Sequence, residues 1–77
     1  MEKDPLILAC YVTNLQLAKD VCFAMAIPPG AHDVSVTEIE GYGWHIDVVC
    51  ENVYVPDQVC RILGKNKSAK VNWVKWL

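Results

Sequence analysis

The segment of residues 34–50 reads VSVTEIEGYGWHIDVVC, and it decides the fold. In each half apolar residues alternate with polar ones, as in strands that bury one face. The halves are separated by Gly41-Tyr42-Gly43, which is typical of a three-residue hairpin loop with Gly43 in the left-handed conformation. We therefore predict a β-hairpin that pairs Val36 with Val48, Val34 with Cys50 and Glu38 with Ile46.

This pairing separates the side chains of the hairpin into two faces. The apolar face, which we expect to meet the helices, contains Val34, Val36, Ile46, Val48 and Cys50. The opposite face then contains Ser35, Thr37, Ile39, His45, Asp47 and Val49. A shift by one residue would mix buried and polar positions, which sheet pairing disfavours.

Before the hairpin, the sequence predicts a strand followed by a helix. Residues 6–12, LILACYV, form a continuous apolar run typical of a central strand. Residues 15–27 are rich in alanine and leucine and predict a helix, with Thr13 and Asn14 as candidate N-caps and Pro28 as its end. One broad side of this helix is apolar and comprises Leu15, Ala18, Val21, Cys22, Met25 and Ala26.

After the hairpin, the sequence predicts a second helix and a last strand. Pro56 suits the first turn of a helix whose apolar stripe is Val59, Ile62 and Leu63, and Gly64 suits its end. His32 falls in a loop at residues 30–33, residues 65–68 form a polar loop, and residues 71–77 form a strand with Trp73 and Trp76 on opposite sides.

This order of elements predicts one α+β domain over residues 1–77. Strand, helix, two strands, helix and strand make the ferredoxin-like β-α-β-β-α-β two-layer sandwich, with both helices on one face of a four-stranded antiparallel sheet. On the first strand we place Leu6, Leu8, Cys10 and Val12 toward the helices. The open face then receives Ile7, Ala9 and Tyr11.

Composition narrows the class of protein. The 77 residues are 53% hydrophobic and 21% charged, which excludes a disordered chain. The net charge of −2 gives no basic footprint for general binding to nucleic acid. No apolar run is long enough for a membrane span and no secretory signal is present, so we expect a cytoplasmic protein without a membrane partner. The four cysteines (Cys10, Cys22, Cys50 and Cys60) lie in apolar surroundings and are expected to be buried free thiols.

The open face is the predicted interaction site. Apolar and aromatic side chains rimmed by polar ones often mark a binding surface. The candidate residues are Tyr11, Thr37, Ile39, His45, Asp47 and Val49, with Phe23 on the polar side of the first helix as a second contact. We expect a small non-catalytic module that binds a protein partner or forms a homodimer. By analogy of size and fold class, accessory proteins and phage-type inhibitors are examples of such modules.

Two short motifs resemble those of RNA-recognition motif domains. Cys10-Tyr11-Val12-Thr13-Asn14-Leu15 is similar to the first-strand motif of that family, and Glu40-Gly41-Tyr42-Gly43-Trp44 is similar to the start of its third-strand motif. The resemblance implies the same order of elements and, as an alternative function, the binding of single-stranded RNA. Tyr11, Tyr42 and Trp44 would then stack on unpaired bases from one surface.

A small enzyme is the second alternative. His45 and Asp47 are two apart on one strand and project from the same face, so they could form an acid–base dyad or half of a metal site. No nucleophile motif, phosphate-binding loop or closely spaced cysteine pair accompanies them. We therefore expect no catalysis, no metal and no cofactor.

Overall fold

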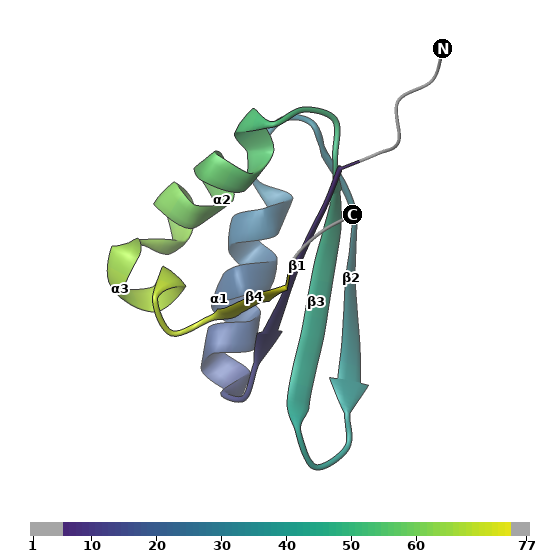
Figure 1. Cartoon of the computed structure of the whole chain (residues 1–77), viewed down its shortest axis with the longest axis vertical. Coiled ribbons are helices and arrows are strands. Elements are labelled where there is room, and N and C mark those ends of the chain that lie inside the picture. Colours follow the sequence, from purple (N-terminus) through teal and green to yellow (C-terminus); the bar gives the residue numbers. More distant parts are fainter. Residues whose placement is uncertain (1–5, 75–77) are drawn as a thin grey trace.

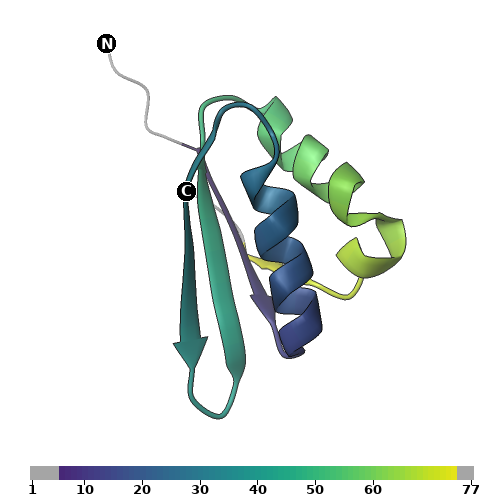
Figure 2. The same cartoon turned by 180° about the vertical axis from the view of Figure 1, so that it is seen from behind.

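The computed structural model describes residues 6–74, which form an antiparallel sheet covered by helices on one face (Figures 1 and 2). The sheet has the order β2-β3-β1-β4, so β1 and β3 are central. This is the expected α+β architecture with an open four-stranded sheet. In chain order the elements are β1 (Leu6–Val12), α1 (Leu15–Ala26), β2 (Ala31–Ile39), β3 (Gly43–Cys50), α2 (Tyr54–Leu63), α3 (Lys65–Ser68) and β4 (Asn72–Val74).

The core lies between the two central strands and the helices. Every second residue of β1 and β3 is buried there: Leu8, Cys10 and Val12 on β1, in the phase assumed for that apolar run, and Ile46, Val48 and Cys50 on β3, as predicted from its alternation. Ala18, Val21 and Met25 of α1 and Val55 and Val59 of α2 close over them. The predicted phase of β1 is therefore confirmed, with Ile7, Ala9 and Tyr11 on the face away from the helices.

The first helix begins with a side-chain cap. The Oδ1 atom of Asn14 accepts a hydrogen bond of 3.0 Å from the backbone N–H of Leu17, so Asn14 is the N-cap. The predicted apolar side needs correction at its ends. Leu15 is 53% exposed and Ala26 is also exposed, because they are the first and last residues of α1 and lie at the margin of the core. Ala24, in contrast, is buried.

The hairpin register differs from the prediction by two residues. Val36 pairs with Ile46 rather than Val48, Glu38 pairs with Trp44, and the three-residue loop comprises residues 40–42. Gly43 is already the first residue of β3, with φ 131°, and a Cβ atom there would collide with the carbonyl oxygen of Val12. A shift of two leaves every side chain on its predicted face.

The second strand begins earlier than expected and contains a bulge. It starts at Ala31, so His32 lies in β2 opposite Val49 and not in a loop. The register shifts between His32 and Ser35, where Asp33 has φ 55°, and Ala31 rather than Val34 pairs with Cys50. Val36 faces the helix side but is 49% exposed, although its partner Ile46 is fully buried, because β2 is an outer strand of the sheet.

The C-terminal third contains an extra helix. Helix α2 begins at Tyr54 and buries Val55, whereas Ile62, expected in the apolar stripe, is 40% exposed. Gly64 ends α2 as predicted, with φ 97°. Residues 65–68 are the one-turn helix α3 and not a loop.

A charged contact ties α3 to α1. The Nζ atom of Lys67 lies 3.1 Å from the Oδ2 atom of Asp20, and this hydrogen bond lowers the pKa of the Asp20 carboxyl, helped by Gln16. Within the described residues the last strand comprises Asn72–Val74, and Trp73 on it faces the helices because it pairs with Cys10. Trp76 lies outside the described residues.

No helix among residues 6–74 has both the length and the apolar character needed to span a bilayer.

Candidate interaction surface

Two strands, β1 and β3, bring a polar trio of Tyr11, His45 and Asp47 to the centre of the open sheet face. Tyr11 of β1 and His45 of β3 are cross-strand partners, and their rings meet edge to face with centroids 5.7 Å apart. The Nδ1 atom of His45 lies 3.8 Å from the Oδ2 atom of Asp47, beyond hydrogen-bonding distance. The side chains of His45 and Asp47 are 30% and 35% exposed, so the trio is accessible from the solvent.

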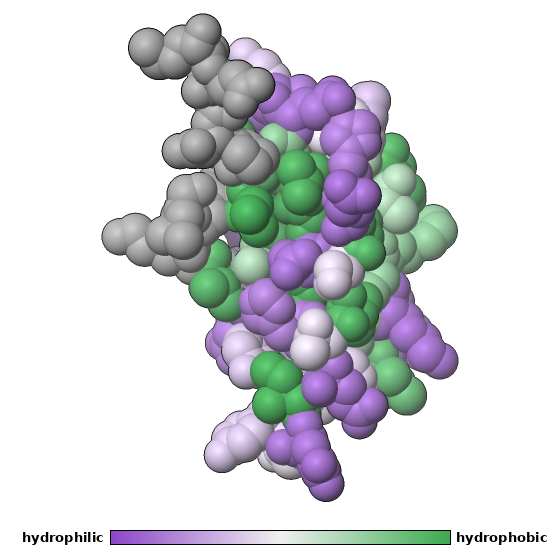
Figure 3. Space-filling view, turned by 90° about the vertical axis from the view of Figure 1, so that its right-hand side faces the viewer, coloured by the Kyte–Doolittle hydropathy of each residue, from purple (hydrophilic) through white to green (hydrophobic). Residues whose placement is uncertain are grey.

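One end of the open face is apolar. Ile7 pairs with Val49, and Ala9 pairs with Val74, so these side chains are neighbours across β3, β1 and β4. Ile7 is 37% exposed and Val74 is 40% exposed. We call Ile7, Ala9, Val49 and Val74 the apolar end. Figure 3 views the molecule from this side and shows apolar and polar areas alternating on the surface.

A hydrogen-bonded pair borders this apolar end. His32 lies opposite Val49, and its Nε2 atom is 2.6 Å from the Oε1 atom of Glu51. Both side chains are at least half exposed. This pair was not predicted from the sequence, because His32 was expected in a loop; it forms because β2 begins at Ala31 and so places His32 beside Glu51.

The remaining predicted residues lie around the polar trio. Thr37 pairs with His45, and Ile39 pairs with Gly43 next to the hairpin loop, so both are on the open face. Phe23 is 68% exposed on α1, on the other side of the molecule, where it borders a hollow that Ile62 and Lys67 also line. Phe23 is therefore not part of the same surface as Tyr11 and Val49. Val74, which the sequence could not assign to a face, joins the surface.

The aromatic residues of the RNA-recognition hypothesis are not on one surface. Tyr11 belongs to the open face, whereas Trp44 is half-buried on the helix side of β3 and packs against the core. Tyr42 is 73% exposed in the hairpin loop. Stacking of successive bases on all three rings would require Trp44 to leave the core.

The thiols pack as small hydrophobic groups. Cys10 and Cys50 are buried and Cys22 and Cys60 are half-buried, and all four are free. Burial, with smaller effects from Cys22, Asp47 and Cys60, raises the pKa of the Cys10 thiol to about 12. Burial also raises the pKa values of Cys22 and Cys50. Within residues 6–74, no three side chains of His, Cys, Asp or Glu are grouped so that they could hold a metal ion.

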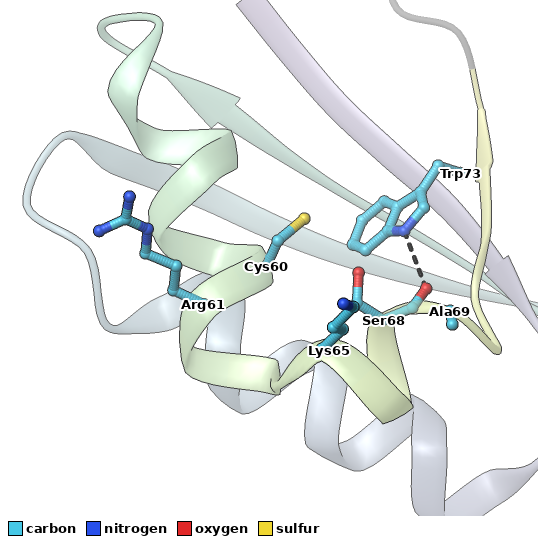
Figure 4. Close-up of a pocket in the computed structure, with 6 residues that line it drawn as sticks. All are labelled: Cys60, Arg61, Lys65, Ser68, Ala69 and Trp73. Carbon is cyan, nitrogen blue, oxygen red and sulfur yellow. Dashed lines mark hydrogen bonds between the residues drawn. The ribbon is translucent and has the colours of Figure 1, made fainter.

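A separate depression lies away from the open face, between α2, α3 and β4. It has a volume of about 580 Å³ and is lined by Cys60, Arg61, Lys65, Ser68, Ala69 and Trp73 (Figure 4). The depression was not predicted from the sequence, because Lys65, Ser68 and Ala69 lie in or next to a segment that was expected to be a loop.

Comparison of the chain with protein-family models, with curated proteins and with solved structures yields no match. The geometry of its surfaces is therefore the basis for assigning a function.

Proposed function

We propose that this chain is a ferredoxin-like domain that acts as a non-catalytic protein-interaction module through its open sheet face. The strand order β2-β3-β1-β4 and the placement of helices on one face support the topology, with α3 as an addition to it. The four free cysteines support a reducing compartment such as the cytoplasm.

One observation carries the functional proposal. The apolar end exposes Ile7 and Val74 beside the Tyr11–His45 pair, and no helix of residues 6–74 covers this face. A protein that buries the apolar end removes apolar area from water, and Tyr11, His45 and Asp47 then provide directional contacts at the centre. The surface suits a second protein, or a second copy of the chain, better than a small molecule, since it has no enclosing walls.

The test is a pair of carboxylates placed in the proposed interface. In Tyr11→Asp with Val49→Asp we expect association to weaken at least about a hundredfold, because each unpaired carboxylate buried against a partner costs several kcal/mol. The readouts are sedimentation equilibrium for self-association and a pull-down from the lysate of the source organism, with and without nuclease.

A matched control is available on the opposite side of the same sheet. Val36→Asp places one such carboxylate at an exposed apolar residue of β2 that faces the helix side, and it is compared with Val49→Asp alone as well as with the double variant. We expect it to associate as the unmodified protein does, and circular dichroism should show that all variants are folded. Unchanged association of the double variant would refute the open-face proposal. Capture of nucleic acid that nuclease removes would favour the RNA-binding alternative.

A further inference from the structure

The depression between α2, α3 and β4 has a preformed apolar floor. The indole of Trp73 forms part of it, and its Nε1–H donates a hydrogen bond of 3.2 Å to the backbone oxygen of Ser68, which fixes the ring. Figure 4 shows the Cys60 thiol directed toward the Trp73 ring. Ala69 completes the lining without a bulky side chain. A partner side chain would therefore meet a rigid apolar surface without a cost for ordering it.

The edge of this depression is positively charged. Arg61 and Lys65 line it, and residues 61–74 contain the further cations Lys67 and Lys70 but no Asp or Glu. Lys67 is held by Asp20, and the Nε atom of Arg61 lies 3.1 Å from the Oδ2 atom of Asp57. Among residues 6–74, Lys65 has no ion-pair partner. It is the cation most available to an incoming carboxylate.

We infer that this depression is a second binding site, which takes an acidic segment of a partner protein. One apolar side chain of that segment lies on the Trp73 floor, and its carboxylates pair with Lys65 and Arg61. The six lining residues provide a floor and a charged edge but no enclosing wall, which suits a side chain carried by a larger partner. This site shares no residue with the open face and does not depend on the open-face proposal.

Charge and chemistry favour a peptide over a nucleic acid at this site. Cys60, Ala69 and the indole of Trp73 make the floor largely apolar, and the indole N–H is already bonded to Ser68, so the floor offers few hydrogen-bond partners to the edges of a base. Residues 31–51 of the hairpin carry Asp33, Glu38, Glu40, Asp47 and Glu51 without a Lys or Arg, and this acidic segment would repel a long phosphate backbone.

The experiment uses three labelled peptides. The first has a leucine between two pairs of glutamates, the second replaces the leucine with glycine, and the third replaces the glutamates with lysines. We expect the first alone to raise the fluorescence anisotropy saturably below about 1 mM, and its affinity to fall with added salt. It should also shift the Trp73 indole N–H resonance, assigned with Trp73→Phe, and slow the alkylation of Cys60.

A charge reversal at the edge of the depression tests the assignment of residues. Lys65→Glu should weaken the acidic peptide roughly five- to twentyfold and allow the lysine peptide to bind. Lys19→Glu is the matched control, since it makes the same change at an exposed position of α1 away from the depression, and it should leave binding unchanged.

Three results would overturn the inference. One is the absence of any shift of the Trp73 indole resonance with the acidic peptide. Another is an equal loss of binding in Lys19→Glu and Lys65→Glu, which would indicate attraction by overall charge. The third is saturable binding of single-stranded oligouridylate with no binding of the acidic peptide.

Discussion

Two glycines of the hairpin both have positive φ angles but different surroundings. Gly41 has φ 82° with open space around the position of a Cβ atom, whereas a Cβ atom on Gly43 would collide with backbone atoms of β1. Gly41→Ala should lower the free energy of unfolding by about 1 kcal/mol, the cost of a left-handed non-glycine residue. Gly43→Ala should lower it by roughly 2–4 kcal/mol, since strain and a backbone clash add.

Urea unfolding of both variants checks this difference. Equal effects at the two positions would show that β1 does not approach Gly43 as closely as the structure indicates. The same contact explains why the predicted register was wrong. The sequence identified a glycine that tolerates positive φ, but the reason for Gly43 lies on another strand, 31 residues earlier at Val12.

At the scale of elements, the start of α1 offers a test with an internal control. The sequence left Thr13 and Asn14 as equivalent candidate caps, and in the structure the Asn14 side chain accepts the hydrogen bond from Leu17. Asn14→Ala should therefore lower the free energy of unfolding by about 1 kcal/mol. Thr13→Ala should change it by less than about 0.5 kcal/mol, as expected for an exposed residue without a cap contact. Thermal unfolding of the two variants measures this, and a larger loss in Thr13→Ala would contradict the assignment of the cap.

The elements differ in how far the sequence could predict them. The faces of β3 were predictable, because a period of two survives a register error of two residues. The phase of β1 was assumed without such a signal, because both of its faces are apolar. Helix α3 was not predictable from its own sequence, which is polar and short. Its clearest tertiary contact is the Lys67–Asp20 pair, and that pair depends on how α2 places the segment against α1. The bulge at Asp33 was missed for the same kind of reason, since it is defined by the partner strand.

At the scale of the whole molecule, the core contains a buried ionisable group, the thiol of Cys10. The pKa of Cys10 is about 12 in the folded protein, whereas the unfolded thiol has its ordinary value of 9.0. Above pH 9 the unfolded chain releases a proton that the folded protein keeps, so stability is complete below pH 9 and falls as the pH rises toward 12.

Urea unfolding at about pH 8 and pH 10.5 tests this linkage, because each pH unit in that window removes up to about 1.4 kcal/mol. Cys10→Ala should be less stable at the lower pH, because it leaves a cavity, but its stability should fall less steeply with pH. The same pH dependence in both proteins would show that Cys10 does not titrate with unfolding.

The candidate surfaces show what a sequence can and cannot predict about binding. Alternation alone placed Thr37, Ile39, His45, Asp47 and Val49 on one face. Tyr11 was placed there by an assumed phase of the first strand, because both faces of that strand are apolar. The structure puts all six residues on the open face. Phe23 was correctly read as exposed but lies on another side of the molecule. The depression at Trp73 combines residues of α2, α3 and β4, and no single periodic pattern contains all of them.

The acidic hairpin and the basic segment at α3 and β4 belong to opposite edges of the sheet, because β2 and β4 are its outer strands. The small net charge of −2 therefore conceals an electric dipole that runs across the sheet from the β2 edge to the β4 edge. In the field of a charged partner, a molecule with such a dipole is rotated before any contact is made. A positively charged partner would thus meet the hairpin first and a negatively charged one would meet Lys65, so orientation during diffusion would already select which surface is presented.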